Sequence, residues 1–206
     1  MKKLTKVGIE TGTDKANYHE FTEFYDQYFS DFISPRIMEI GVYKLKSIEM
    51  YLKYFDEPYI LGIDIIDKTN YLNNKWVFKQ CDQSKIKDLI RITENEEKFN
   101  IIIDDGGHTM KQQQVSLGYL IDYVKPKGYY IVEDLHTSFR ANFIESDCKV
   151  TTYDLLLDWK NGKLTMSNYI SEKQQKNIIN KIEFIEFYYK NPNDLTDSVT
   201  SVIKLK

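Results

Sequence analysis

The hydrophobic pattern of this chain consists of short, nearly continuous apolar runs that alternate with segments of helical spacing. The runs cover residues 36–41, 59–63, 75–79, 99–103 and 129–132, and a glycine or an acidic residue stands at or soon after the end of each. Continuous apolar character is typical of strands buried on both faces of a parallel sheet. Between the runs, apolar residues recur at helical spacing, as in residues 48–55, 86–90 and 117–124. The alternation predicts right-handed crossovers and a doubly wound α/β fold.

The C-terminal part of the chain breaks this alternation. Residues 182–189 and 198–205 have strand character, and the short connection Asn191-Pro192-Asn193 leaves no room for a helix between them. We therefore expect these two strands to pair antiparallel. The predicted sheet is mostly parallel, has seven strands and ends in an antiparallel hairpin.

Two further segments lie outside the strand–helix alternation. Residues 14–31 are aromatic and polar with helical character, and residues 1–35 are expected to form an N-terminal helical cap. Residues 137–176 interrupt the strand order and are predicted to be an inserted lid over the site. We find no repeat and no linker, so residues 1–206 are predicted to form one domain.

Composition and charge narrow the class of protein. The formal net charge is −3, from 28 basic and 31 acidic side chains that are well mixed, so no basic footprint for nucleic acid is present. No stretch is apolar for long enough to cross a bilayer, and the first residues are not a signal peptide. Cys81 and Cys148 belong to no metal-binding pattern and are expected to be free thiols. We therefore expect a cytoplasmic protein without a nucleic-acid or membrane partner. Aromatic residues near the N-terminus make a homo-oligomer possible, although core packing also explains this stripe (Tyr18, Phe21, Phe24, Tyr25 and Tyr28).

Polar residues gather where the predicted strands end. In an open α/β sheet, ligands bind beyond the carboxyl ends of the strands, so this clustering predicts a site there. Asp64 lies 23 residues after Gly41, where a carboxylate can accept the two hydroxyls of a ribose. The alternative is a helix-capping or turn aspartate beside an ordinary glycine turn.

The densest polar cluster joins the ends of the fourth and fifth runs. Asp104, Asp105, Glu133 and Asp134 would repel one another there if they were left unpaired. A hard divalent cation relieves that repulsion, and oxygen ligands suit Mg²⁺, Mn²⁺ or Ca²⁺. His108 follows a Gly-Gly step that lets it fold back toward the same space, where it is a candidate general base. In the alternative interpretation, the acids cap a helix or are solvated and His108 is a loop residue. His136 either touches substrate or is a loop histidine.

At these residues the sequence resembles a known family: the metal-dependent sugar O-methyltransferases of macrolide and aminocoumarin antibiotic pathways, with relatives in bacterial polysaccharide gene clusters. The resemblance rests on six motifs between residues 12 and 134, namely Gly12-Thr-Asp-Lys15 with His19, Glu39-Ile-Gly41-Val42, Gly62-Ile-Asp64, Asp82-Gln83, Ile103-Asp-Asp-Gly106 with His108, and Glu133-Asp134. It implies a Rossmann-like class I methyltransferase fold that binds S-adenosylmethionine and Mg²⁺.

The resemblance also implies residue roles. Asp105, Glu133 and Asp134 match the family's magnesium ligands, and His108 matches its general base. His136 is a candidate substrate contact from its position alone, because it follows Glu133 and Asp134 closely. In the same way, Asp64 would hold the ribose of the cofactor. The residues expected around S-adenosylmethionine are Thr13, Asp14, Lys15, Glu39, Gly41, Ser47, Asp64, Asp82, Gln83 and Asp104.

Two departures from the family pattern stand out. The family usually continues its first loop as Gly-Val-x-x-Gly-Gly-Ser, whereas Leu45 and Lys46 replace the two later glycines here. Side chains there are expected to crowd the methionine end of the cofactor, unless a lysine instead pairs with the cofactor carboxylate. The second departure is Gly107, which stands where serine is usual.

The function predicted from these motifs is Mg²⁺-assisted O-methylation of a sugar hydroxyl, with a nucleotide-linked sugar or a glycan precursor of polysaccharide biosynthesis as the acceptor. A nicotinamide-dependent oxidoreductase is disfavoured because Gly-x-Gly-x-x-Gly is absent after the first strand. A metal-dependent hydrolase remains an alternative, and so does a degenerate protein that binds S-adenosylmethionine or a partner without catalysis.

Overall fold

The strands of the computed structural model, which describes residues 1–71 and 74–206, form one seven-stranded sheet in the order β3-β2-β1-β4-β5-β7-β6. The first five strands pair in parallel, whereas β7 lies antiparallel to both β5 and β6. This sheet confirms the predicted fold class. The strands are β1 (Arg36–Ile40), β2 (Tyr59–Asp64), β3 (Val77–Gln80), β4 (Phe99–Asp104), β5 (Val124–Val132), β6 (Ile182–Tyr189) and β7 (Val199–Leu205).

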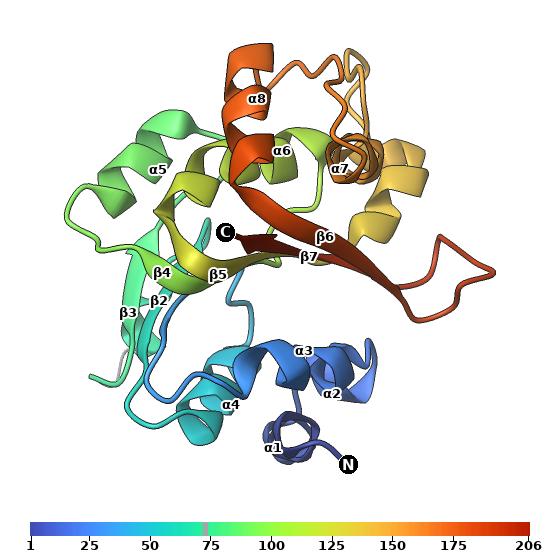
Figure 1. Cartoon of the computed structure of the whole chain (residues 1–206). Helices are drawn as coiled ribbons and strands as arrows, with labels where there is room; N and C mark the ends of the chain where they lie inside the picture. The colour runs from blue at the N-terminus through green and yellow to red at the C-terminus, as the bar shows by residue number, and fades with distance from the viewer. Residues whose placement is uncertain (72–73) are drawn as a thin grey trace.

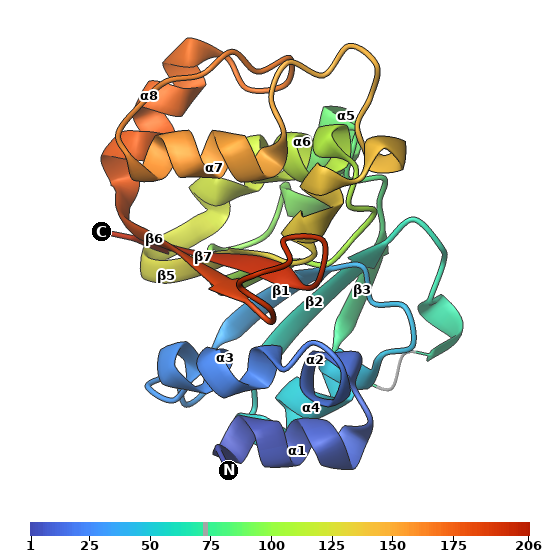
Figure 2. The same cartoon turned by 90° about the vertical axis from the view of Figure 1, so that its right-hand side faces the viewer.

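Helices cover both faces of this sheet. One face carries α1 (Lys3–Thr11), α2 (Asp14–Asn17), α3 (Phe21–Phe29) and α4 (Lys46–Tyr54), and the opposite face carries α5 (Ile86–Thr93), α6 (Met110–Leu120), α7 (Thr152–Lys160) and α8 (Glu172–Lys181) (Figures 1 and 2). Short 3₁₀ turns complete the chain: η1 (Thr69–Tyr71), η2 (Ile121–Tyr123), η3 (Leu135–Phe139) and η4 (Ala141–Phe143). No helix in the described part of the chain is both long and apolar enough to span a bilayer.

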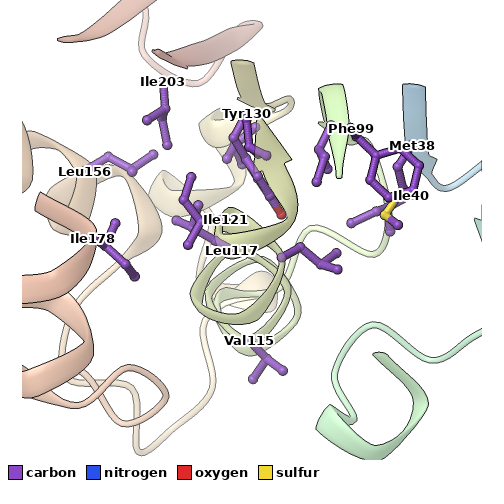
Figure 3. Close-up of a cluster of buried hydrophobic side chains, with 14 of the residues drawn as sticks. Met38, Ile40, Phe99, Val115, Leu117, Ile121, Tyr130, Leu156, Ile178 and Ile203 are labelled. Carbon is purple, nitrogen blue, oxygen red and sulfur yellow. The ribbon is translucent and has the colours of Figure 1, made fainter. Parts of the chain in front are cut away.

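Successive strand residues supply the two cores on either side of the sheet. On β4, Ile102 faces the cluster under α5–α8, whereas Ile101 and Ile103 face the cluster under α1–α4, and all three are fully buried. Figure 3 shows side chains of the first cluster, among them Leu117, Leu156 and Tyr130 of β5. Since side chains alternate between the faces of a strand, a strand buried on both faces must be apolar at every position. This explains the continuous apolar runs.

The N-terminal region differs in detail from the prediction. The expected helix over residues 14–31 is divided into α2 and α3, because Glu20 adopts a left-handed conformation with φ of 62° between them. The preceding helix α1 lies within the helical cap predicted for residues 1–35, but its bounds were not predicted. Most of the aromatic stripe is packed inside the protein, and only Tyr18 is largely exposed, at 59%. Self-association through these aromatic residues therefore loses its main support, and the oligomeric state stays a prediction.

Part of the segment predicted to be a lid is packed in the core. Leu155, Leu156 and Trp159 of α7 are buried in the core under α6, as is Ile170 just before α8. This part of residues 137–176 therefore belongs to the helical layer of the fold, because its apolar side chains are needed to cover the sheet. At the start of the segment, η3 follows directly from the end of β5 and contains His136.

Candidate functional site

A pocket of about 360 Å³ opens at the carboxyl ends of β1, β2 and β4, within the range of small-molecule sites. A second, smaller pocket lies beside it, and Asp14, Gly41, Tyr43 and Asp105 line both. Among the predicted site residues, the first pocket also has Asp64, Asp82, Gln83, His108 and Asp134 in its wall, and the second has Thr13, Lys15 and Ser47. The residues predicted from the strand ends therefore line these two neighbouring pockets.

Gly41 allows two strand ends to approach closely at the junction of the pockets. It has φ of 82°, and a Cβ at this position would lie 2.1 Å from the backbone oxygen of Asp105. Its N–H donates to Ile63, while the N–H of Asp105 donates to Ile40, so the loops continue the ladder beyond the strands. Any other residue would push these loops apart and would also be strained by the positive φ.

Asp64 is held so that its carboxylate faces the pocket. One oxygen accepts from the N–H of Val42 at 3.1 Å and the other from the N–H of Ile66 at 2.9 Å. The carboxylate thus fixes the two loops that flank it, while it stays in the pocket wall. Fixed carboxylate oxygens are suited to accept hydrogen bonds from a pair of ligand hydroxyls.

The loop after Gly41 keeps a left-handed turn without a glycine. Leu45 has φ of 62° and caps α4, and its side chain packs against the aromatic core. Lys46 pairs with Glu49 on the exposed face of the helix at 3.0 Å. Ser47 turns inward and donates to Glu39 at 2.6 Å.

Asp104 was predicted to contact the cofactor, but it lies behind the pocket wall. It is 1% exposed, lines neither pocket, and accepts from Gln83 at 2.9 Å and from the hydroxyl of Ser116. Burial raises the pKa of Asp104 to about 6, although the hydrogen bonds from Ser116 and Gln83 act to lower it. Gln83 in turn accepts from the N–H of Gly107 at 2.8 Å. Asp104 therefore orients Gln83 rather than facing the pocket itself.

Asp105, His108 and Asp134 form a group that can hold a cation. One ligand atom from each lies within 4.8 Å of the other two. Nε2 of His108 is 3.4 Å from an oxygen of Asp134 and 4.0 Å from one of Asp105. His108 and Asp134 both adopt left-handed conformations, with φ of 60° and 53°, a backbone strain that is common at functional sites.

The chemistry of this group fits a divalent cation. One buried oxygen of Asp134 and Nδ1 of His108 have no hydrogen-bond partner among the described residues. A buried carboxylate oxygen without a donor is costly unless a cation or water satisfies it. Two carboxylates suit Mg²⁺, and an added imidazole nitrogen also suits Mn²⁺.

Glu133, predicted as a third metal ligand, is engaged elsewhere. Its carboxylate is 2% exposed, with one oxygen 2.6 Å from the ammonium of Lys15 and the other accepting from the hydroxyl of Tyr25 at 2.5 Å. It lies outside the group of close ligand atoms, although it precedes Asp134 directly. Tyr25 was not predicted as a site residue, because nothing in the sequence distinguishes it from the other members of the aromatic stripe.

All three histidines of the chain surround Asp134. Nδ1 of His136 is 3.7 Å and Nδ1 of His19 is 3.8 Å from the same Asp134 oxygen. His19 is held by Ser198, 2.5 Å from its Nδ1, at the start of β7. Burial lowers the pKa of His136, so its neutral ring is favoured. The predicted substrate contact at His136 thus lies beside the cation group.

The strand order, the antiparallel hairpin and the site at the carboxyl ends of β1, β2 and β4 define a class I methyltransferase fold. The MycE methyltransferase from the mycinamycin biosynthetic pathway, solved in complex with Mg and SAH, superposes with a TM-score of 0.80 at 26% identity, over 100% of this chain and 54% of that one. A further MycE structure, with Mg, SAH and mycinamycin VI, gives a TM-score of 0.78 at 27% identity, over 98% of this chain and 54% of that one.

The sequence relatives agree with this match. Mycinamicin VI 2''-O-methyltransferase of Micromonospora griseorubida is 32% identical over 167 residues, which are 74% of this chain and 42% of the relative. The 8-demethyl-8-alpha-L-rhamnosyl tetracenomycin-C 2'-O-methyltransferase of Streptomyces olivaceus is 30% identical over 149 residues, 68% of this chain and 39% of the relative. No family model matches the chain. The chain is a homologue of sugar O-methyltransferases, and it spans less than half the length of these curated relatives.

Proposed function

We propose that this chain transfers the methyl group of S-adenosylmethionine to a sugar hydroxyl, assisted by a divalent cation. The observation that carries the proposal is the placement of Asp105, His108 and Asp134 in the wall of the same pocket as Asp64. Asp64, which is proposed to bind the ribose, and the cation group, which is proposed to bind the acceptor, therefore line the same cavity. By their names, the relatives described above are O-methyltransferases of mycinamicin VI and of a rhamnosyl tetracenomycin.

The two pockets divide the cofactor between them. The adenosine part fits the larger pocket, where Asp64 accepts the ribose hydroxyls and Asp82 and Gln83 border the base. The methionine part fits the smaller pocket along Thr13 and Asp14, with Gly41 at the junction. Glu39 supports this wall from behind through its hydrogen bond with Ser47.

Asp105 and Asp134 are the residues proposed to hold Mg²⁺, or Mn²⁺ or Ca²⁺ in its place. The cation supplies positive charge that lowers the pKa of a bound hydroxyl. Participation of Glu133 requires one of its oxygens to be released from Lys15 or Tyr25.

His108 performs the proton transfer in this proposal. Its Nε2 faces the carboxylates and accepts the hydroxyl proton, and Nδ1 carries the other ring proton. The acceptor oxygen then forms a bond to the methyl carbon as the carbon–sulfur bond breaks, which leaves S-adenosylhomocysteine as a neutral thioether. His136, next to Asp134, positions the acceptor.

The acceptor class follows from the relatives, and a sugar attached to a macrolide or polyketide is the first candidate. A nucleotide-linked sugar or a glycan precursor stays a prediction from the sequence resemblance, so an acceptor panel should contain both groups. We also place the reaction in the cytoplasm, where the free thiols Cys81 and Cys148 would stay reduced.

The substitution His108→Ala tests the proposal. Loss of a general base lowers turnover by roughly 100-fold to 10,000-fold, whereas the affinity for S-adenosylmethionine should change little because His108 stands at the cation end of the pocket. Turnover with the acceptor panel and calorimetric binding of the cofactor are measured on the same preparation. Retained turnover would remove His108 as the base. Tight cofactor binding by the unsubstituted protein without turnover on any acceptor would favour a non-catalytic role.

A further inference from the structure

Lys15 is a buried cation surrounded by carboxylates from three strand ends. It is 1% exposed, and its ammonium lies 2.6 Å from Asp105, 2.6 Å from Glu133 and 3.5 Å from Glu39. These acids follow or end β4, β5 and β1, while Lys15 belongs to the short helix α2 of the N-terminal region. Lys15 therefore ties the N-terminal helices to the part of the sheet that forms the site.

The ammonium of Lys15 offsets part of the negative charge of Glu39, Asp105 and Glu133. Glu39 and Glu133 are 0% and 2% exposed, and the side chain of Asp105 is 25% exposed. The ammonium of Lys15 lies 2.6 Å from one oxygen of Asp105 and 2.6 Å from one oxygen of Glu133, and such close carboxylates stabilise its positive charge. Removal of the ammonium would leave the carboxylates of Glu39, Asp105 and Glu133 close together without a positive charge between them, so they would repel one another.

Asp105 connects this cluster to the cation group. One of its oxygens is bound by Lys15, and the other faces His108 in the group with Asp134. Lys15 thus fixes the orientation in which Asp105 presents its free oxygen. A divalent cation at this group and the ammonium of Lys15 would both be stabilised by the negative charge of Asp105, and the two cations would repel each other.

We propose that Lys15 is a built-in counter-cation, which keeps Glu39, Asp105 and Glu133 assembled in the metal-free protein and weakens the affinity of the neighbouring site for a divalent cation. The proposal makes Lys15 a positioning residue and not a ligand of the methyl donor. It rests on the proposed function only in that the group of Asp105 and Asp134 binds a cation.

The substitution Lys15→Met provides the test, with Lys15→Arg as the variant that keeps the charge. Thermal unfolding is followed in EDTA, in Mg²⁺ and in Mn²⁺ at constant ionic strength, and Mn²⁺ affinity is measured by calorimetry without S-adenosylmethionine. We expect Lys15→Met to lower the Tm in EDTA. We also expect Mn²⁺ to raise the Tm of this variant by more than it raises the Tm of the unsubstituted protein. Because one unit of opposing charge is removed at close range, the affinity for Mn²⁺ should rise by about 10-fold or more. Lys15→Arg should show no such rise.

A role for Lys15 in packing alone predicts a different result. In that case Lys15→Met lowers the Tm equally in EDTA and in Mn²⁺ and leaves the Mn²⁺ affinity unchanged, which would overturn the proposal. If Lys15→Met does not fold, the double variant Lys15→Met/Glu39→Gln removes one buried charge of each sign without altering Asp105 or Glu133. Recovery of folding in the double variant supports the proposal, and failure to recover contradicts it.

The outcome is separable from the proposed methyl transfer. Enhanced Mn²⁺ binding by Lys15→Met supports the counter-cation even if the protein transfers no methyl group. Normal methyl transfer together with unchanged Mn²⁺ affinity in Lys15→Met would refute the counter-cation and leave the proposed function intact.

Discussion

The hydroxyl of Tyr25 is the buried donor that fixes Glu133 beside the site, and its removal tests how strongly this polar cluster is held. Tyr25 is fully buried, and its hydroxyl donates to Glu133 at 2.5 Å. Burial, together with the nearby charge of Glu133, raises the pKa of Tyr25, so the hydroxyl remains a donor throughout the neutral range. Tyr25→Phe removes only this oxygen and leaves the packing of the ring intact.

The expected cost follows from the type of bond. A hydrogen bond to a charged group contributes roughly 1.5–3 kcal/mol, and its loss leaves a buried carboxylate oxygen without a donor. We therefore expect Tyr25→Phe to lower the free energy of unfolding by about 2 kcal/mol. For a protein of this length, this corresponds to a decrease in Tm of about 4–8 °C.

Tyr51→Phe is the matched control. Tyr51 is equally buried, but its hydroxyl lies 3.5 Å from Glu39, at the outer limit of a hydrogen bond. Its removal should cost less than about 1 kcal/mol. Urea unfolding of both variants at pH 7.5, monitored by circular dichroism, gives the two free energies. Equal costs for the two substitutions would refute the assignment of Tyr25 as the anchor of Glu133.

Two further substitutions test the backbone and the buried acid. Gly41→Ala should destabilise the fold by more than about 3 kcal/mol or prevent folding, since its Cβ would meet the Asp105 carbonyl, whereas Gly12→Ala, at φ of 76° in open space, should cost only about 1–2 kcal/mol in thermal unfolding. Asp104 has a pKa raised from 3.8 to about 6, so its contribution to stability is complete below pH 3.8 and is lost as the pH rises through 6. Asp104→Asn does not titrate, so the stability advantage of the unsubstituted protein over it should shrink by about 2.5 kcal/mol between pH 4 and pH 7.5 in denaturant titrations. A difference that is constant with pH would show that Asp104 does not titrate in this range.

The sheet was predictable because a strand buried on both faces leaves a simple pattern. Residues 99–103 are apolar except for Asn100, and residues 182–189 match β6. Helix boundaries were less predictable. Glu20 divides the N-terminal helix through its own backbone conformation, and Val124 begins β5 although it continues the apolar spacing of α6.

The residues of the site were predictable where strand ends determine position. Asp64, Asp105 and Asp134 reach the pocket because parallel strands end at one edge of the sheet. The partners of Glu133 were not predictable, since Lys15 and Tyr25 come from helices whose packing on the sheet cannot be inferred from spacing.

The most direct test of the central claim is calorimetric titration of the purified chain with S-adenosylmethionine, with and without Mg²⁺. We predict a one-to-one complex with a dissociation constant in the micromolar range, formed despite Leu45 and Lys46 in the wall of the smaller pocket. The absence of binding under both conditions would contradict it and would leave a methyltransferase fold that serves another purpose, with metal-dependent hydrolysis by the acid cluster as the next activity to assay.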